Sequence, residues 1–144
     1  MKWMLWKDFT IDELYEVLKL RSEIFVVEQE CPYQDLDDLD QDALHLTYRE
    51  KGKLIGYLRL LFPKENMIKI GRVVVEKEHR HLGIATKLLK ESLQWIKENR
   101  EEKEILLSAQ VYATKLYSNL GFQKEGESYL EDGIPHIEMK KDIV

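Results

Sequence analysis

The stretch VVVEKEHRHLGIA, residues 73–85, decides the fold of this chain. Its three β-branched valines are typical of a strand, and a segment with apolar residues at helical spacing begins near Gly83 and Ala85. A helix that starts after a strand and a turn has free backbone N–H groups in its first turn. Those donors and the positive end of the helix dipole favour an anion such as a pyrophosphate. The same residues also fit a structural alternative, an ordinary helix start in which the glycine is only a small packing residue.

Upstream of this stretch, the sequence predicts a short strand, a helix and three further strands. Thr10 and Glu13 have the spacing of a capping box, and Pro32 ends the helical region. The expected strands are residues 3–6, 43–49, 54–62 and 67–75, with turns at 51–52 and 63–66. The apolar positions of the helix are Ile11, Leu14, Tyr15, Leu18, Ile24 and Phe25.

Downstream, the pattern predicts a long helix, a strand, a short helix and a final hairpin. The long helix ends near Asn99, and its apolar positions are Leu82, Ala85, Leu89, Leu93 and Ile96. A strand at 105–110, a helix at 113–120 closed by Gly121, and strands at 122–130 and 135–139 around Asp132-Gly133 complete the chain. This order predicts a mixed α+β fold with antiparallel hairpins and one helical crossover.

Composition limits the classes of protein to which the chain can belong. It has 144 residues with 22 Lys and Arg against 27 Asp and Glu, a net charge of −5, which argues against a general nucleic-acid binder. The single cysteine, Cys31, excludes an internal disulfide. The sequence contains no readable signal peptide and no apolar run long enough to cross a membrane. We therefore expect one soluble, cytoplasmic domain over residues 1–144 without nucleic-acid or membrane partners.

Four motifs in order resemble the GNAT superfamily of acyl-CoA N-acyltransferases. Arg80-x-x-Gly83-x-Ala85 matches the Q/R-x-x-G-x-G/A signature between a Val-rich strand and an amphipathic helix. A second motif, Ala113-x-x-Leu116-Tyr117 with Gly121-Phe122, follows at the family's distance. Residues 25–35 and 131–137 are similar to the ElaA-like branch of the superfamily.

The resemblance implies a single-domain mixed sheet, flanked by helices and splayed between its fourth and fifth strands. The pantetheine arm of acetyl-CoA would lie in that gap and its pyrophosphate on the loop before the helix. Many relatives carry Asn three residues before the alanine of the second motif, where this chain has Gln110. This residue departs from the family pattern at a position that contacts the cofactor. The residues that the resemblance assigns to cofactor binding are Val73, Val74, Val75, Arg80, His81, Leu82, Gly83, Ile84, Ala85, Gln110 and Tyr117.

The implied reaction transfers an acetyl group from acetyl-CoA directly to a primary amine on a small molecule, a peptide N-terminus or a lysine. Tyr117 has the family's general-acid position near the CoA sulfur, although a tyrosine there also fits packing beside Leu116 and Leu120. A base must remove a proton from the amine, and Glu28 is the first candidate and His136 the second. A solvated helix-end carboxylate and a satisfied strand histidine are the structural alternatives.

Two other functions stay open: a CoA-binding regulatory module without turnover, and an interaction domain whose motifs are coincidental. The oligomeric state is also open, with a homodimer as one option. No spacing of His, Cys, Asp and Glu predicts a metal site. Asp38, Asp40 and Asp42 have the spacing of calcium ligands, but Ala43 and Arg49 stand where a calcium loop needs Gly and Glu. We expect residues 35–42 to be a solvated acidic loop, able to attract a cationic substrate, and the Cys31 thiol to be structural.

Overall fold

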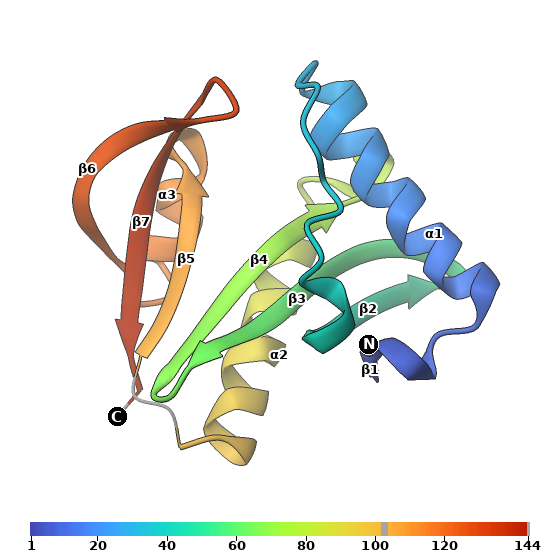
Figure 1. The fold of residues 1–144 in the computed structure, drawn as a ribbon, viewed down its shortest axis with the longest axis horizontal. Coiled ribbons are helices and arrows are strands. Elements are labelled where there is room, and N and C mark those ends of the chain that lie inside the picture. The colour runs from blue at the N-terminus through green and yellow to red at the C-terminus, as the bar shows by residue number, and fades with distance from the viewer. Residues whose placement is uncertain (102–103, 144) are drawn as a thin grey trace.

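A seven-stranded mixed sheet forms the centre of the computed structural model, which describes residues 1–101 and 104–143 (Figure 1). The strands lie in the order β1-β2-β3-β4-β5-β7-β6, and within these described residues β4 and β5 are the only parallel neighbours. The α+β fold with one helical crossover is therefore confirmed. The strand bounds are β1 (Lys2–Leu5), β2 (Leu44–Glu50), β3 (Lys53–Lys64), β4 (Met67–Val75), β5 (Glu104–Gln110), β6 (Gln123–Glu131) and β7 (Ile134–Asp142).

The helices follow the predicted order. Thr10 and Glu13 form the expected capping box: the Thr10 hydroxyl accepts from the Glu13 N–H at 3.1 Å, and the Glu13 carboxylate accepts from the Thr10 N–H at 2.9 Å. The helices are α1 (Ile11–Arg21), which continues into a π-helical segment η2 (Ser22–Glu28), α2 (Ile84–Asn99) and α3 (Thr114–Ser118). Short 3₁₀ turns are η1 (Trp6–Asp8), η3 (Asp40–Asp42), η4 (Lys77–His79) and η5 (Val111–Ala113). Among the described residues, no helix combines the length and apolarity needed to cross a membrane.

The start of α2 corrects one prediction. Leu82 was expected on the apolar face of the helix, but it lies before the helix and its exposed fraction is 63 %. Gly83, with φ of 76°, has a left-handed conformation that a right-handed helix does not continue through, so α2 begins at Ile84.

Two apolar clusters occupy opposite faces of the sheet, with α1 on one face and α2 on the other (Figure 1). On the α1 face, Val17 and Leu20 pack with Tyr57 and Val74. The larger cluster, on the α2 face, joins Leu88, Leu89 and Ile96 to residues of β2 through β5. Gly56 of β3 permits close packing there, since a Cβ at that position would lie 3.0 Å from Leu88 Cδ1 and 3.2 Å from Ile84 Cγ2.

The turns predicted at 51–52 and 132–133 are confirmed, the turn predicted at 63–66 is limited to residues 65–66, and two strands run longer than expected. Lys51-Gly52 and Asp132-Gly133 all have φ between 51° and 80°, as tight hairpin turns require. Strand β3 continues through Pro63 to Lys64, beyond its predicted end at residue 62. A shift of register between Leu61 and Lys64 accommodates the proline, which cannot donate to a regular ladder. Strand β7 likewise extends to Asp142.

Candidate functional site

The fourth and fifth strands pair at one end and separate at the other (Figure 1). Their pairing is confined to Met67–Lys69 with Glu104–Leu106, so the second half of β4 has no partner strand on that side within the described residues. This geometry confirms the splayed sheet that the family resemblance predicted.

The open edge of β4 contains the three predicted valines. Val74 is buried against the α1 face, and Val73 and Val75 pack against the other cluster. The N–H of Glu76 donates to the Ile55 carbonyl of β3 at 2.8 Å. Because consecutive residues of a strand direct their backbone groups to opposite edges, the N–H and C=O of Val75 point to the open edge. An extended ligand could therefore form strand-like hydrogen bonds there.

A bulge immediately precedes these valines. Arg59 of β3 is opposite Gly71, but Tyr57 is opposite Val74, so β4 contains one extra residue over this span. Arg72 lies in it and has φ of 53°, a left-handed conformation that costs a residue with a side chain about 1–3 kcal/mol. Sequence reasoning missed this feature, since an arginine gives no signal for positive φ.

The loop before α2 presents free backbone donors. Gly83 occupies the N-cap position, no side chain caps the helix, and its first turn contains no acidic residue. The Lys87 N–H is bonded to the Gly83 carbonyl at 3.0 Å, which leaves the N–H groups of Ile84, Ala85 and Thr86 without helical partners. A Cβ at Gly83 would meet nothing within 4 Å, so the space beside it is open. These features suit an anion.

Arg80 and Glu28, predicted for different roles, form one ion pair. Both guanidinium Nη atoms donate to the Glu28 carboxylate at 2.5 Å, and both side chains are about one-third exposed. The hydrogen bonds from Arg80 lower the pKa of Glu28, aided by the charges of Arg80 and Lys77 and opposed by partial burial. In this arrangement Glu28 is a weakened base and Arg80 is already occupied.

The segment after η2 crosses the open end of the gap. Next to the Glu28 pair, the Gln110 side chain of β5 donates to Gln29 at 3.3 Å. The Cys31 thiol donates to the Asp132 carbonyl of the β6–β7 turn at 2.9 Å. Residues 28–31 thus contact the loop before α2, the end of β5 and the β6–β7 turn, and the predicted Gln110 lies at this junction.

Tyr117 lies in the larger core cluster. Its ring meets Phe122 edge-on, with 6.2 Å between ring centroids, and its exposed fraction is 9 %. Burial raises the pKa of the Tyr117 hydroxyl to about 12, so this group keeps its proton at neutral pH. It is thus in the protonation state that a general acid requires.

His136 has a defined tautomer. Its Nδ1 lies 2.7 Å from the Ile134 carbonyl, which only accepts hydrogen bonds, so Nδ1 carries the proton. Its Nε2 lies 3.4 Å from the Glu131 carboxylate. Because His136 is opposite Gln110 in the β5–β7 register, it belongs to the same end of the gap as residues 28–31.

The expectation of a solvated acidic loop at residues 35–42 is wrong for Asp35 and Asp40, while Asp38 and Asp42 are exposed. Asp35 and Asp40 are buried, with exposed fractions of 8 % and 3 %, and arginines neutralise both. Their partners, Arg21 and Arg59, are buried too. A signal was present, because Arg59 stands alone among the apolar residues of its strand, and a buried arginine needs a carboxylate partner.

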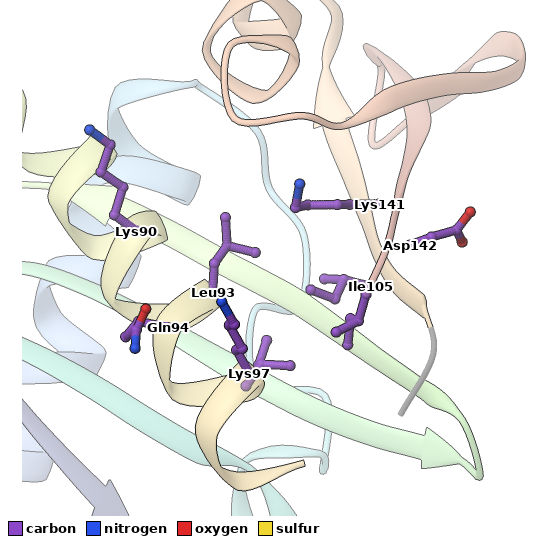
Figure 2. Close-up of a pocket in the computed structure, with 9 residues that line it drawn as sticks. Lys90, Leu93, Gln94, Lys97, Ile105, Lys141 and Asp142 are labelled. Carbon is purple, nitrogen blue, oxygen red and sulfur yellow. The ribbon is translucent and has the colours of Figure 1, made fainter. Parts of the chain in front are cut away.

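One hollow lies elsewhere, between the second half of α2, the start of β5 and the end of β7 (Figure 2). Its volume is about 330 Å³, and Leu93, Ile105 and three lysines contribute to its lining. None of the predicted site residues lines it, so we place the candidate site at the strand edge. Among the described residues, no cluster of three or more His, Cys, Asp or Glu could hold a metal ion.

Comparison with known proteins agrees with this geometry. Residues 12–143 match the model of the acetyltransferase (GNAT) domain family. A UPF0039 protein of Schizosaccharomyces pombe is 42 % identical over 135 residues, covering 92 % of this chain and 90 % of the relative.

Two crystal structures superpose closely. An acyl-CoA N-acyltransferase from Pseudomonas aeruginosa has a TM-score of 0.90 and 42 % identity, with 97 % of each chain covered. ElaA of Escherichia coli has a TM-score of 0.90 and 34 % identity, covering 98 % of this chain and 99 % of that one.

Proposed function

The chain belongs to the GNAT family of acetyltransferases, and we propose that residues 1–144 form one domain that transfers an acetyl group from acetyl-CoA to a primary amine. The observation that carries the proposal is an unpaired β4 edge beside an uncapped start of α2. An extended arm with amide groups fits the first, and a pyrophosphate fits the second. Acetyl-CoA has both parts.

In this proposal the amides of the pantetheine arm pair with Val75, and the pyrophosphate lies against the N–H groups of Ile84 and Ala85. Residues 73–75 and 80–85, with Gln110, line the path between them. Arg80 adds a positive charge at the rim of the phosphate site.

Phosphate binding and the availability of Glu28 are linked, because both involve Arg80. A pyrophosphate competes with the Glu28 carboxylate for the same guanidinium. Acetyl-CoA that engages Arg80 therefore frees Glu28, and the pKa of Glu28 rises toward its ordinary value when that partner leaves. The proposed base becomes available only when the acyl donor is bound.

In the proposed reaction each of these groups has one role. The amine lone pair attacks the thioester carbonyl carbon, the C–S bond breaks, and the excess proton of the amine passes to Glu28, directly or through water. Backbone N–H groups of the open β4 edge stabilise the developing oxyanion. The Tyr117 hydroxyl gives its proton to the leaving thiolate and regains one from solvent.

His136 is the second candidate base. Its Nδ1 is bonded to the Ile134 carbonyl, so Nε2, 3.4 Å from the Glu131 carboxylate, is the ring atom that would take the proton of the amine. Its position opposite Gln110 places it on the side of the gap away from β4.

Two measurements on the wild-type protein test the function. Calorimetric titration with acetyl-CoA should give saturable binding, and thiol release should accelerate when small amines, peptide N-termini or lysine peptides are added. Binding without amine-dependent thiol release would instead support a non-catalytic CoA-binding module. Absence of binding at millimolar acetyl-CoA would reject both.

A further inference from the structure

The bulge residue Arg72 is held by the loop that precedes β2. Its Nε lies 2.8 Å from Asp35 Oδ1, and its Nη2 donates to the Asp35 carbonyl at 3.0 Å and to Asp37 Oδ2 at 3.3 Å. The guanidinium also lies over the ring of Tyr33, 5.9 Å from the centroid. Contacts to one loop therefore fix both the side chain and the left-handed backbone of Arg72.

Two buried arginines fix that loop in turn. Arg21 Nε donates to Asp35 Oδ2 at 3.0 Å, and the Nη atoms of Arg59 donate to both oxygens of Asp37, at 2.9 and 2.5 Å. Asp40 joins the two arginines, accepting from each at 2.8 Å. Burial alone would raise the pKa of Asp37, but its bonds to Arg59 lower it to about 2, so this carboxylate stays charged.

Each aspartate of this network keeps an arginine partner without Arg72, although three carboxylates then face two arginines. Asp35 keeps Arg21, and Asp37 keeps Arg59, when Arg72 is removed. The Arg72 side chain is also the most exposed of the three arginines, at 21 % against 1 % and 3 %. Its contacts therefore join the bulge of β4 to the loop that holds the aspartates.

The bulge lies directly before Val73–Val75, whose open edge is the proposed acyl-CoA surface. A bulge bends its strand and increases the local twist, so the conformation of Arg72 sets the direction of the donors that follow it. We propose that Asp35 and Asp37, acting through Arg72, are positioning residues that orient the open edge of β4 for acyl transfer. This inference rests on the proposed function.

The test uses Arg72→Gly, because glycine adopts φ near 53° without strain and removes the contacts to the loop. We expect the melting temperature to stay within a few degrees and kcat to fall about 10- to 100-fold, the range expected for misplaced reacting groups. Amide hydrogen exchange should accelerate at residues 73–75. Arg72→Lys keeps the positive charge, so it should have a higher kcat and slower exchange at residues 73–75 than Arg72→Gly.

Arg49→Ala is the matched control. Arg49 is also a partly exposed strand arginine, paired with Glu16 at 2.9 Å, but it lies in β2 away from the bulge. The Arg49→Ala substitution should leave kcat and the amide exchange of residues 73–75 unchanged.

The proposal is overturned if Arg72→Gly keeps wild-type exchange at residues 73–75 with kcat within about twofold, a difference of about 0.4 kcal/mol in the barrier. It is also overturned if Arg72→Gly fails to fold, since Arg72 would then be needed for stability. If the wild-type protein itself shows no turnover, the proposed function fails, and the exchange data alone decide whether the loop holds the strand.

Discussion

At the scale of single residues, Tyr117 separates chemistry from packing. Tyr117→Phe keeps the ring against Phe122 and removes only the hydroxyl. General acids contribute about 10²–10⁴-fold, and because a CoA thiolate is already a fair leaving group we expect kcat to fall about 10- to 100-fold. Steady-state turnover and a binding isotherm should give this loss with an unchanged Kd for acetyl-CoA. If the chemical step limits the rate and the variant stays within about twofold of wild type, about 0.4 kcal/mol, another group is the acid.

Substitution of Glu28 should change both the turnover rate and the affinity for acetyl-CoA, whereas a carboxylate outside the site would change neither. Glu28→Gln removes the proposed base and also removes the competitor for Arg80. We therefore expect kcat to fall while acetyl-CoA binds up to about fivefold more tightly, corresponding to the roughly 1 kcal/mol upper range of an exposed ion pair. His136→Gln serves as the comparison and should leave the Kd unchanged. If Glu28→Gln keeps the wild-type kcat and His136→Gln is inactive, the general base is His136 and not Glu28.

At the scale of elements, the loop before α2 requires glycine for its backbone and open space for its ligand. Gly83→Ala strains the left-handed N-cap and should cost about 1–2 kcal/mol of stability. It should retain most of the affinity, because a methyl group is small and carries no charge that would repel the phosphates. Gly83→Glu should lose similar stability and should also repel the phosphates.

The alanine variant thus isolates backbone strain from charge. Titration of both variants with acetyl-CoA should show a large loss of affinity only for Gly83→Glu. If the Kd of Gly83→Glu for acetyl-CoA is within about threefold of the Kd of Gly83→Ala, a difference of about 0.65 kcal/mol in binding free energy, the phosphates bind elsewhere.

The loop at residues 35–42 makes the fold sensitive to acid. The pKa of Asp37 is about 2 in the folded protein and 3.8 ordinarily, so its charged form favours the folded state. This contribution, about 2 kcal/mol, is complete above roughly pH 4 and is lost as the pH falls toward 2. Urea unfolding between pH 6 and 2 should therefore show a smaller decline in the free energy of unfolding for Asp37→Asn than for wild type. Equal slopes would show that the Arg59 pair does not contribute.

At the scale of the whole molecule, local patterns were sufficient to predict the order of the elements. Capping at Thr10, the Lys51-Gly52 and Asp132-Gly133 turns, and the apolar spacing of α2 are all short-range signals. The pairings between distant segments had no such signal: Glu28 with Arg80, Gln29 with Gln110, and Arg72 with Asp35 join residues from 37 to 81 positions apart. The acidic loop was misread for this reason, since its arginines come from α1, β3 and β4.

The splay of β4 from β5 is the property of the whole sheet on which the proposed function depends. The most direct test is amide hydrogen exchange of the wild-type protein with and without CoA. We predict slower exchange at Val75 and in the first turn of α2, with no change in β1 and β2. Protection confined to the hollow beside the second half of α2, or no protection at the open edge of β4 under saturating CoA, would contradict the account.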